Sequence, residues 1–540
     1  MRTIISLLNC CLLALFSIAI PLHAANPVIV HEWGTFTSLQ DGRGQAIGGI
    51  NVDDEPVPDF VWQVAGVSVT NPHSRNEENI GLPPYTETGG KGWAVGDPTV
   101  TMRLETPVLY IYPPKGQTAR SVPPLDVHVD FHGGILSQYY PYAQVEDVPL
   151  NGGIPFVKDK IIDSTMSGLT WKGVQIGASG KPVPTDDKYN LETYPSLRGE
   201  PVKTDDKVWT TPREVSAPLL EVKFSEPDNK GGSHDFIQAE HFLFYRGVGH
   251  LDSPLFLSPG STNGKQGLAI SSPMSGTGLG GKFDWAWMVQ IRADGSCAYY
   301  CLDHPEPLPF VTVPVARFPD VPASFADSDF SIDSLNKLKV SMQAALIKES
   351  LYPDEASAML RTWELSYFKS PGLRFFYIVP RAWVDKVLPL TITGAPTEIT
   401  RVMMGRIELV TDAQRLALER LVAGPCPNLP AVKAEVQKAL QNGKLTQKKV
   451  DAFYRGERPL SELGIVIPPL VQDYLGLGRF RDALVMDEFQ RRPSLALAQF
   501  IKENHIAPAG MEIKGRDVLQ LSPDVSLRNS GHTSSTELRY

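Results

Sequence analysis

The chain has few cysteines: five occur among its 540 residues. Three of them, Cys297, Cys301 and Cys426, lie outside the N-terminal apolar segment. Haem attachment needs a histidine directly after the second cysteine of a pair, and Leu302 stands at that place here. A zinc site needs a second pair of ligands at suitable spacing, which the residues around Cys301 do not offer. The pattern therefore favours a local disulfide or buried thiols.

Concentrated positive charge is also missing from the sequence. Lys and Arg total 51 against 60 Asp and Glu, which gives a net charge of −9, and no stretch gathers basic residues into a stripe. Proteins that bind nucleic acid usually carry such a stripe or patch. We therefore expect no nucleic-acid partner.

Two signatures of common enzyme classes are absent as well. No Gly-x-Ser-x-Gly elbow occurs, so an α/β-hydrolase is not indicated. Residues 276–282 resemble a phosphate-binding loop, but Phe283 stands where Ser or Thr should follow the lysine, and a predicted strand follows instead of a helix. We therefore predict a flexible hairpin connection there and no nucleotide partner.

The longest apolar run is at the N-terminus. Arg2 precedes an apolar segment from Ile4 to Ile20, and Pro21 and Ala24 follow it. This order is typical of a secretory signal peptide, here residues 1–24. A retained membrane anchor is the alternative, because the run exceeds the usual core of roughly 7–15 residues; Pro21, however, ends it short of a spanning helix of roughly 20. We therefore expect a secreted or periplasmic protein that meets the membrane only through an uncleaved signal segment.

Export has a consequence for the cysteines. An exported chain meets an oxidising environment, so Cys297 and Cys301 are disulfide candidates, with each other or with Cys426. An odd number of cysteines leaves the pairing open.

Short strands dominate residues 25–322. Pro and Gly interrupt this region at short intervals, and the apolar periodicity between them is mostly two, as where Leu220, Val222 and Phe224 alternate with charged residues. Many short strands with few helices predict a mainly β, sandwich-like domain over residues 25–322. The clearest predicted strands are 28–36, 100–112, 125–132, 242–246 and 283–292.

The periodicity changes after residue 325. Apolar residues at helical spacing predict helices over 331–350 and 353–368, and extended segments follow. We predict a mixed α/β segment over 323–410, either a small domain of its own or an extension packed on the β domain.

Beyond residue 410 the signals are nearly all helical. Thr411 to Gln414 form a capping-box pattern, which marks the start of a helix. We predict an all-helical region over residues 411–521 and a disordered tail over 522–540, where apolar residues are few.

Several segments resemble a family of secreted bacterial proteins. The most distinctive is the His31-Glu32-Trp33-Gly34-Thr35-Phe36-Thr37 start of the mature chain. The other segments are Leu104–Tyr110, Glu240–Gly247, Val384–Leu390 and Arg401–Arg406. No activity is assigned to that family. The resemblance therefore implies one extended, exported architecture and supplies no catalytic residues.

The clearest candidate site is the predicted strand 125–132. Its apolar residues share one face, and four ionisable residues share the other: Asp126, His128, Asp130 and His132. Side chains two apart on a strand lie roughly 6–7 Å from each other. His128 and Asp130 are therefore candidates for catalytic acid/base groups or for ligands of a divalent metal. The alternative is a solvated strand face.

A metal held by His128 and Asp130 would need a more distant third ligand. His31 is the candidate, because a recruited histidine would complete a His/carboxylate site. The alternative is an edge strand that uses Trp33 and Phe36 for packing.

Four further residues are candidates for the site. Glu240 and Arg246 flank a segment that is apolar on both faces, which predicts a strand buried on both sides. Buried charges need partners, so Glu240 is a catalytic candidate and Arg246 a binding candidate if they line a cleft; a structural ion pair is the favoured alternative. Tyr139 and Tyr140 are candidates for an exposed aromatic platform that binds glycans.

The resulting expectation is an exported hydrolase that acts on an extracellular or periplasmic polymer, with a divalent metal as a candidate cofactor. The alternative is a non-catalytic glycan-binding or cell-envelope scaffold protein.

The signal-peptide prediction can be tested directly. We expect the exported chain to be cut after Ala24, so that N-terminal sequencing and intact mass identify Ala25 as the first residue. An intact chain that starts at Met1 and sediments with the membrane fraction would support the retained anchor instead.

Overall fold

The computed structural model describes residues 26–52, 57–58, 60–63, 93, 96–146, 160–177, 180–183, 207–227, 232–262, 265–273, 282–308, 315–424, 429–446, 464, 466, 468–503 and 506. The predicted signal peptide 1–24, the glycine-rich segment 276–281, Cys426 and the predicted tail 522–540 lie outside the described residues.

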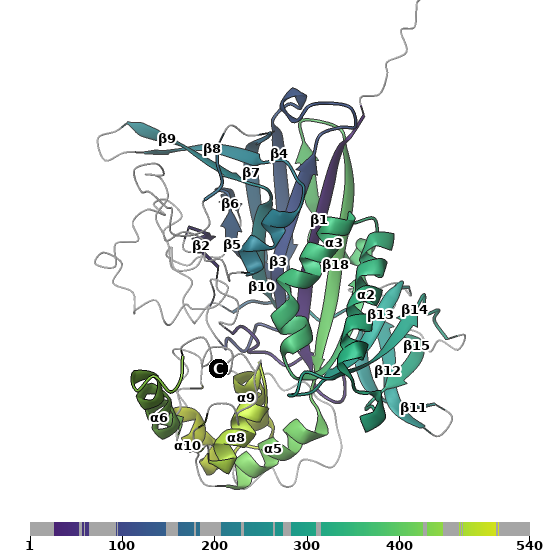
Figure 1. Cartoon of the computed structure of the whole chain (residues 1–540), viewed down its shortest axis with the longest axis vertical. Coiled ribbons are helices and arrows are strands. Elements are labelled where there is room, and N and C mark those ends of the chain that lie inside the picture. Colours follow the sequence, from purple (N-terminus) through teal and green to yellow (C-terminus); the bar gives the residue numbers. More distant parts are fainter. Residues whose placement is uncertain are drawn as a thin grey trace, which may run out of the picture.

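The described chain is mainly β, with three sheets and with helices mostly in its second half (Figure 1). This confirms the predicted β-rich character of the chain. The largest sheet has nine strands, in the order β14 (Cys297–Asp303), β13 (Trp285–Ile291), β16 (Gly372–Val379), β18 (Thr397–Leu409), β1 (Val28–Gln40), β3 (Met102–Tyr112), β10 (Leu243–Gly249), β5 (Gly134–Tyr140) and β2 (Trp62–Gln63).

Strand β1 lies in the middle of this sheet, and its expected place at an edge was wrong. It pairs in parallel with β18, from Val28 opposite Thr397 to Gln40 opposite Leu409, and antiparallel with β3 on its other side. All but one of its thirteen residues are buried. The alternation of polar and apolar residues in β1 cannot reveal a central position, because its polar side chains are buried by partners from distant segments.

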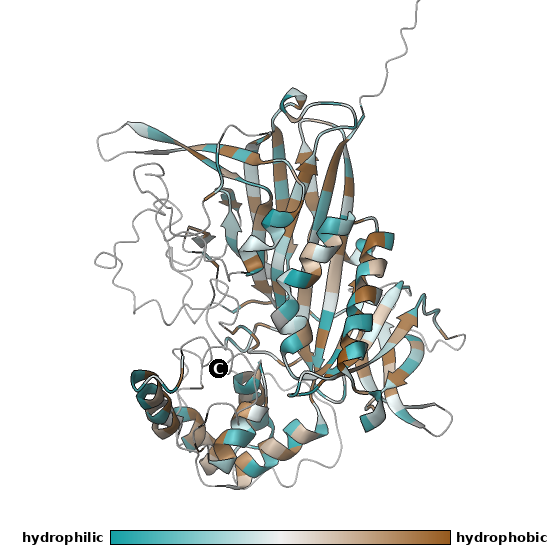
Figure 2. Ribbon diagram, viewed as in Figure 1, coloured by the Kyte–Doolittle hydropathy of each residue, from teal (hydrophilic) through white to brown (hydrophobic). Residues whose placement is uncertain are grey.

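A second sheet carries the strand that the sequence singled out. Its order is β17 (Leu390–Thr393), β4 (Leu125–His132), β7 (Met166–Ile176), β8 (Leu220–Pro227) and β9 (Ser233–Glu240), and β6 (Gln144–Glu146) also pairs with β7. Strand β4 has the predicted bounds and strictly alternates buried and half-buried residues. Strands β8 and β9 form a hairpin that reaches away from the body (Figure 2). Polar and apolar residues alternate in β8, and β9 begins with three exposed polar residues.

The two larger sheets pack against each other through their apolar faces. Trp171 of β7 and Tyr245 of β10 are 6.1 Å apart between ring centroids, and the apolar residues of β4 belong to the same core cluster. The third sheet, β11 (Phe256–Thr262), β12 (Lys265–Pro273) and β15 (Val315–Pro322), contributes Leu257 and Phe318 to that core.

The predicted helices after residue 330 are present as α2 (Ile332–Lys348) and α3 (Pro353–Thr362), which continues after a break as η6 (Glu364–Lys369). The Ser331 hydroxyl accepts a hydrogen bond from the Ser334 amide and so caps α2. A further helix, α4 (Arg381–Val387), separates β16 from β17. The expected boundary at residue 322 does not separate two sheets, because β16 and β18 belong to the nine-stranded sheet.

The remaining described helices gather at one end of the molecule (Figure 1). They are α5 (Asp412–Ala423), α6 (Leu429–Gln441), α8 (Pro469–Gly476), α9 (Arg481–Arg491) and α10 (Leu495–Glu503). The predicted capping box is confirmed, because the Thr411 hydroxyl accepts from the Gln414 amide and the Gln414 side chain accepts from the Thr411 amide. Most of these helices share a second apolar core, which also takes in Leu39 of β1. No helix among the described residues is both long and apolar enough to cross a membrane.

Each residue of the His31-Glu32-Trp33-Gly34 segment has a structural partner. His31 points toward α3, where its Nδ1 lies 2.7 Å from Oε2 of Glu355. Glu32 points to the opposite face and forms a buried ion pair with Arg401 of β18. The Trp33 ring is fully buried, and a side chain at Gly34 would come within 3.0 Å of the backbone of Pro107.

The Glu32–Arg401 pair predicts a large stability effect. Arg401 is buried, donates to the Leu388 carbonyl at 2.6 Å and also pairs at 3.0 Å with Asp385, which is 44% exposed. Glu32→Ala therefore removes the fully buried carboxylate partner of this cation. We expect the free energy of unfolding in urea to fall by about 3–5 kcal/mol.

Glu398→Ala is the matched control, because Glu398 lies on the same strand as Arg401 but is exposed. We expect a change within about 0.5 kcal/mol for that variant. Equal unfolding midpoints for the two variants would contradict the role assigned to the ion pair.

Candidate functional site

The polar face of β4 is open to solvent and forms a hydrogen-bonded row with its neighbours. Strand β7 lies between β4 and β6, and Thr170 of β7 stands opposite His128 on one side and Gln144 on the other. The His128 and Asp130 side chains are 30% and 29% exposed, and that of Glu146 on β6 is 45% exposed. The row therefore presents ionisable groups from neighbouring strands to one surface.

The row contains four residues in sequence of contact. Nε2 of His128 lies 3.0 Å from Oδ1 of Asp130, and its Nδ1 lies 2.7 Å from the Thr170 hydroxyl. The same hydroxyl lies 2.6 Å from Oε1 of Glu146. A side chain at Gly168 would come within 3.0 Å of Oδ1 of Asp130, so the glycine leaves room between the two carboxylates.

This geometry lets the row hold or release one proton without moving a heavy atom. When both nitrogens of His128 carry protons, Nε2–H donates to Asp130, Nδ1–H donates to Thr170, and Thr170 donates to Glu146. When Nδ1 passes its proton to the Thr170 oxygen, the Thr170 proton passes to Glu146, and the hydroxyl then donates to Nδ1 while it accepts from the protonated Glu146. The arrangement of base, orienting carboxylate and hydroxyl is one that acid/base catalysis uses.

Asp126 and His132 lie at the two ends of the polar face of β4. Asp126 accepts from the Gly173 amide at 2.8 Å and pairs with Lys172 at 3.2 Å, and these two groups hold the pKa of its carboxyl below the usual value. His132 is half-buried and makes no side-chain hydrogen bond within the described part of the chain. Asp126 and His132 therefore do not join the row.

The structure does not bring His31 to His128 and Asp130. His31 lies on the nine-stranded sheet, where its ring contacts Tyr352 and its Nδ1 faces Glu355. The described residues contain no group of three or more His, Cys, Asp or Glu side chains placed to hold a metal ion. The sequence could not show this, because the two histidines belong to different sheets.

Glu240 lies in a structural ion pair, which was the favoured alternative. Its carboxylate is fully buried and accepts from Arg213 at 2.6 Å and from the Trp209 indole at 3.1 Å. Arg246 is buried in β10 and donates to the Gln138 side chain. Strand β10 is buried on both faces, as predicted.

The expected exposure of Tyr139 and Tyr140 was wrong. Both rings are buried, at 4% and 1% exposure, and Tyr140 packs edge-on against Trp209 and Phe60. They lie in β5, which pairs with β10 inside the nine-stranded sheet. Two consecutive tyrosines suggest an exposed side, but this strand is covered on both faces.

Cys297 and Cys301 are both free thiols in the structure. They lie four residues apart on β14, which separates their Cα atoms by roughly 13 Å. A disulfide needs Cα atoms less than roughly 7 Å apart, so these two cannot pair without rearranging the strand. Burial raises the pKa of the Cys297 thiol to about 11, which makes it a poor nucleophile.

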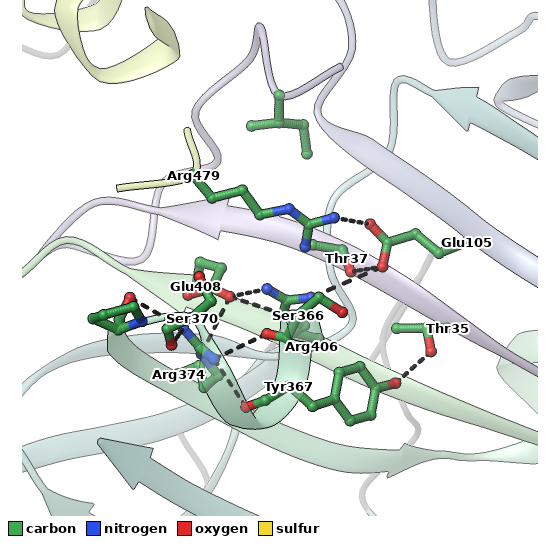
Figure 3. Close-up of polar contacts among 12 residues, drawn as sticks. Thr35, Thr37, Glu105, Ser366, Tyr367, Ser370, Arg374, Arg406, Glu408 and Arg479 are labelled. Atoms are coloured by element: carbon green, nitrogen blue, oxygen red, sulfur yellow. Dashed lines mark hydrogen bonds and ion pairs between the residues drawn. The ribbon is translucent and has the colours of Figure 1, made fainter. Parts of the chain in front are cut away.

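A second polar constellation lies inside the nine-stranded sheet, below the helical end (Figure 3). Arg406 of β18 donates to Glu408 at 2.5 Å, and Arg479, between α8 and α9, donates to Glu105 of β3 at 3.2 Å. The Thr37 hydroxyl of β1 also donates to Glu105, at 3.0 Å. Burial alone would raise the pKa of Glu408, but the guanidinium groups of Arg374 and Arg406 hold it below the usual value.

Arg374 shows that this buried network is structural. Its guanidinium donates to four backbone carbonyls at the end of η6 and the turn after it, those of Ser366, Tyr367, Ser370 and Pro371, at 2.8–3.3 Å. Those carbonyls would otherwise lack partners at a helix end. The network therefore ties η6, the sheet and the helical end together.

Thr170 and Glu146 complete the His128 row and Glu355 holds His31, and none of the three was predicted from the sequence. Alternation in β7 would have placed Thr170 among its polar positions. Nothing in the sequence shows that β6 pairs with β7 or that α3 covers β1.

Comparisons with known proteins add little to this geometry. No family model and no curated protein matches the chain. Among solved structures, the chain resembles the yeast delta-COP-I mu-homology domain with 7% identity and a TM-score of 0.21, over 71% of this chain and 98% of that domain. A TM-score this low supports no inference about fold or function.

The buried tyrosines predict the alkaline behaviour of the protein. Burial raises the pKa values of Tyr139 and Tyr140 above the usual value of about 10. A raised pKa stabilises the fold below pH of about 10, and that contribution is lost as the pH rises further. We expect the phenolate absorbance of these residues to appear only when the fold opens, whereas all tyrosines should titrate together near pH 10 in guanidinium.

Titrations of wild type, Tyr139→Phe and Tyr140→Phe show whether the absorbance change on unfolding comes from these two tyrosines. Each variant should lose part of the phenolate absorbance change that accompanies unfolding. A native protein in which these residues ionise near pH 10 without unfolding would show that they are accessible.

Proposed function

We propose that this chain is an exported hydrolase that uses His128 as its acid/base group on a polymeric substrate. The single observation that carries the proposal is the row Asp130–His128–Thr170–Glu146 on the open face of the second sheet. Asp130 orients the ring, and Glu146 and Thr170 accept or return a proton as the state of His128 changes.

An extended substrate suits this surface. The row crosses neighbouring strands. The side chains of His128, Asp130 and Glu146 are between 29% and 45% exposed, whereas Thr170 is 4% exposed, so a chain laid across the strands could reach the three exposed members. Export, membership of the secreted bacterial family and a periplasmic or extracellular polymer belong to the same proposal, and the N-terminal segment and the His31-Glu32-Trp33-Gly34 start support them.

The proposal needs no metal at the row. Both ring nitrogens of His128 already face protein partners, and Thr170 and Asp130 fix the orientation of the ring. A divalent metal, like a substrate, therefore has to displace one of these hydrogen bonds before it can use the histidine.

The finer architecture is also part of the proposal. We propose that the two larger sheets form a β-sandwich around the Trp171–Tyr245 contact, and that residues 411–521 form an all-helical region. The helices described between residues 412 and 503 support the second statement.

A second candidate function is non-catalytic binding of a glycan or envelope polymer on the same face. The observation that favours it is that the row lies on a sheet surface rather than among the lining residues of the described pocket. Hydrogen-bonding side chains on several strands would then recognise the polymer without chemistry.

Activity of the purified mature chain separates the two functions. We expect turnover of a polysaccharide, ester or peptide from a substrate panel, with and without chelator. His128→Ala should lower kcat by about 10²–10⁴, because it removes the acid/base group. Thr170→Val keeps the shape of the side chain and removes the link to Glu146, so it should also lower kcat and shift the pH profile.

Asp126→Asn is the matched control, since Asp126 lies on the same face of β4 outside the row. It should retain activity. If His128→Ala is as active as wild type, the catalytic role of the row is wrong. Polymer binding that His128→Ala abolishes, with no turnover of any substrate, would establish the second candidate instead.

A further inference from the structure

A pocket lies where the three-stranded sheet, the ends of β16 and β18, and the helical end of the molecule meet. Its volume is about 860 Å³, which is within the range of small-molecule sites, roughly 300–1,000 Å³. It is on the nine-stranded sheet and the third sheet, whereas the His128 row is on the second sheet. Nothing in the proposed hydrolase mechanism uses it.

Positive charge predominates in the pocket lining. Its lining includes three arginines, Arg43, Arg415 and Arg491, and two aspartates, Asp41 and Asp412. Asp41 is already satisfied, because Oδ2 lies 3.0 Å from Arg491 and 3.3 Å from Arg43 and its carboxylate accepts two backbone amides.

Arg415 is the cation of the pocket that has no close protein partner among the described residues. It makes no hydrogen bond there, and its one ion pair is a 4.0 Å contact with Asp412, whose carboxylate is fully exposed. Its guanidinium lies over Gly42, where a side chain would come within 2.2 Å of Nη2. The missing side chain at Gly42 therefore leaves room for the Arg415 guanidinium at the pocket. The N–H donors of Arg415 stay available to a ligand.

The pocket lining also includes apolar residues. Leu257 and Leu268 come from the β11–β12 hairpin, and Leu373 and Leu409 come from the paired ends of β16 and β18. Apolar lining residues together with a guanidinium that has no close partner among the described residues suit a molecule with an anionic head and an apolar body.

We propose that this pocket binds an amphiphilic organic anion, with its carboxylate or phosphate head on Arg415 and its apolar body against the leucines. The forked guanidinium can hold either head through two parallel hydrogen bonds. A ligand in this position contacts α5, β12 and β18 together, so it also joins the helical end to the sheets.

Calorimetric titration of the mature protein tests the site with three probes of equal chain length: decanoate, decyl phosphate and decanol. We expect decanoate or decyl phosphate to bind at least about tenfold more tightly than decanol, because only the anions engage Arg415. The stronger of the two identifies the head group as carboxylate or phosphate. Equal affinity for all three probes, or no binding of any, would overturn the assignment.

Two variants test the role of Arg415. Arg415→Gln should weaken anion binding at least about tenfold and leave decanol unchanged. Ala413→Glu should also weaken it, because it adds a carboxylate at an exposed pocket position in the first helical turn, where an acidic residue does not disturb the helix. Unchanged anion affinity in both variants would refute the proposal.

Arg361→Gln is the matched control, because Arg361 on α3 is 49% exposed, against 40% for Arg415, and is not part of the pocket. It should bind the anions as wild type does. A loss of affinity equal to that of Arg415→Gln would show that the effect is a general one of net charge.

Discussion

The parallel pairing of β1 with β18 is the constraint on which the rest of the fold depends. It joins segments about 370 residues apart, and it continues over thirteen residue pairs from Val28 to Gln40. The buried Glu32–Arg401 ion pair crosses the same two strands. Because a buried charge is tolerated only with its partner, this pair favours one register over a slipped one. Strands β3 and β16 then extend the sheet on either side.

Five charged residues of the family-like segments are buried inside the fold, four of them in the nine-stranded sheet and Glu240 at the end of β9 in the second sheet. Glu32, Glu105, Glu240, Arg401 and Arg406 all come from such segments, and all five are buried. Each has a charged or hydrogen-bonding partner from another part of the chain. Buried ion pairs and hydrogen bonds therefore connect these segments to distant parts of the fold. This gives a physical reason for rare residue combinations that involves no catalysis: a buried ion pair requires both of its members.

The surfaces that remain open differ in chemistry, and we propose a separate role for each. The second sheet presents a row in which every polar group has a protein partner and a proton can change place. The pocket beside α5 instead holds a cation whose partner is distant and an apolar wall. The first surface is suited to proton transfer and the second to holding an anion. Arg479 and Arg491 connect the helical end to the sheets, so the walls of the pocket come from parts of the chain that are held together.

The amino-acid sequence by itself determined the local elements. The bounds of β4, the start of α5 and the helices after residue 330 follow from periodicity and capping, because these depend on neighbours within a few residues. It also identified His128 and Asp130 as neighbours on one face. Only the tertiary structure decided that β1 is central, that Tyr139 and Tyr140 are buried, that His31 faces Glu355 and that Thr170 and Glu146 complete the row. Those features depend on which distant segments pair, and pairing is set by the packing of the whole chain rather than by local preference.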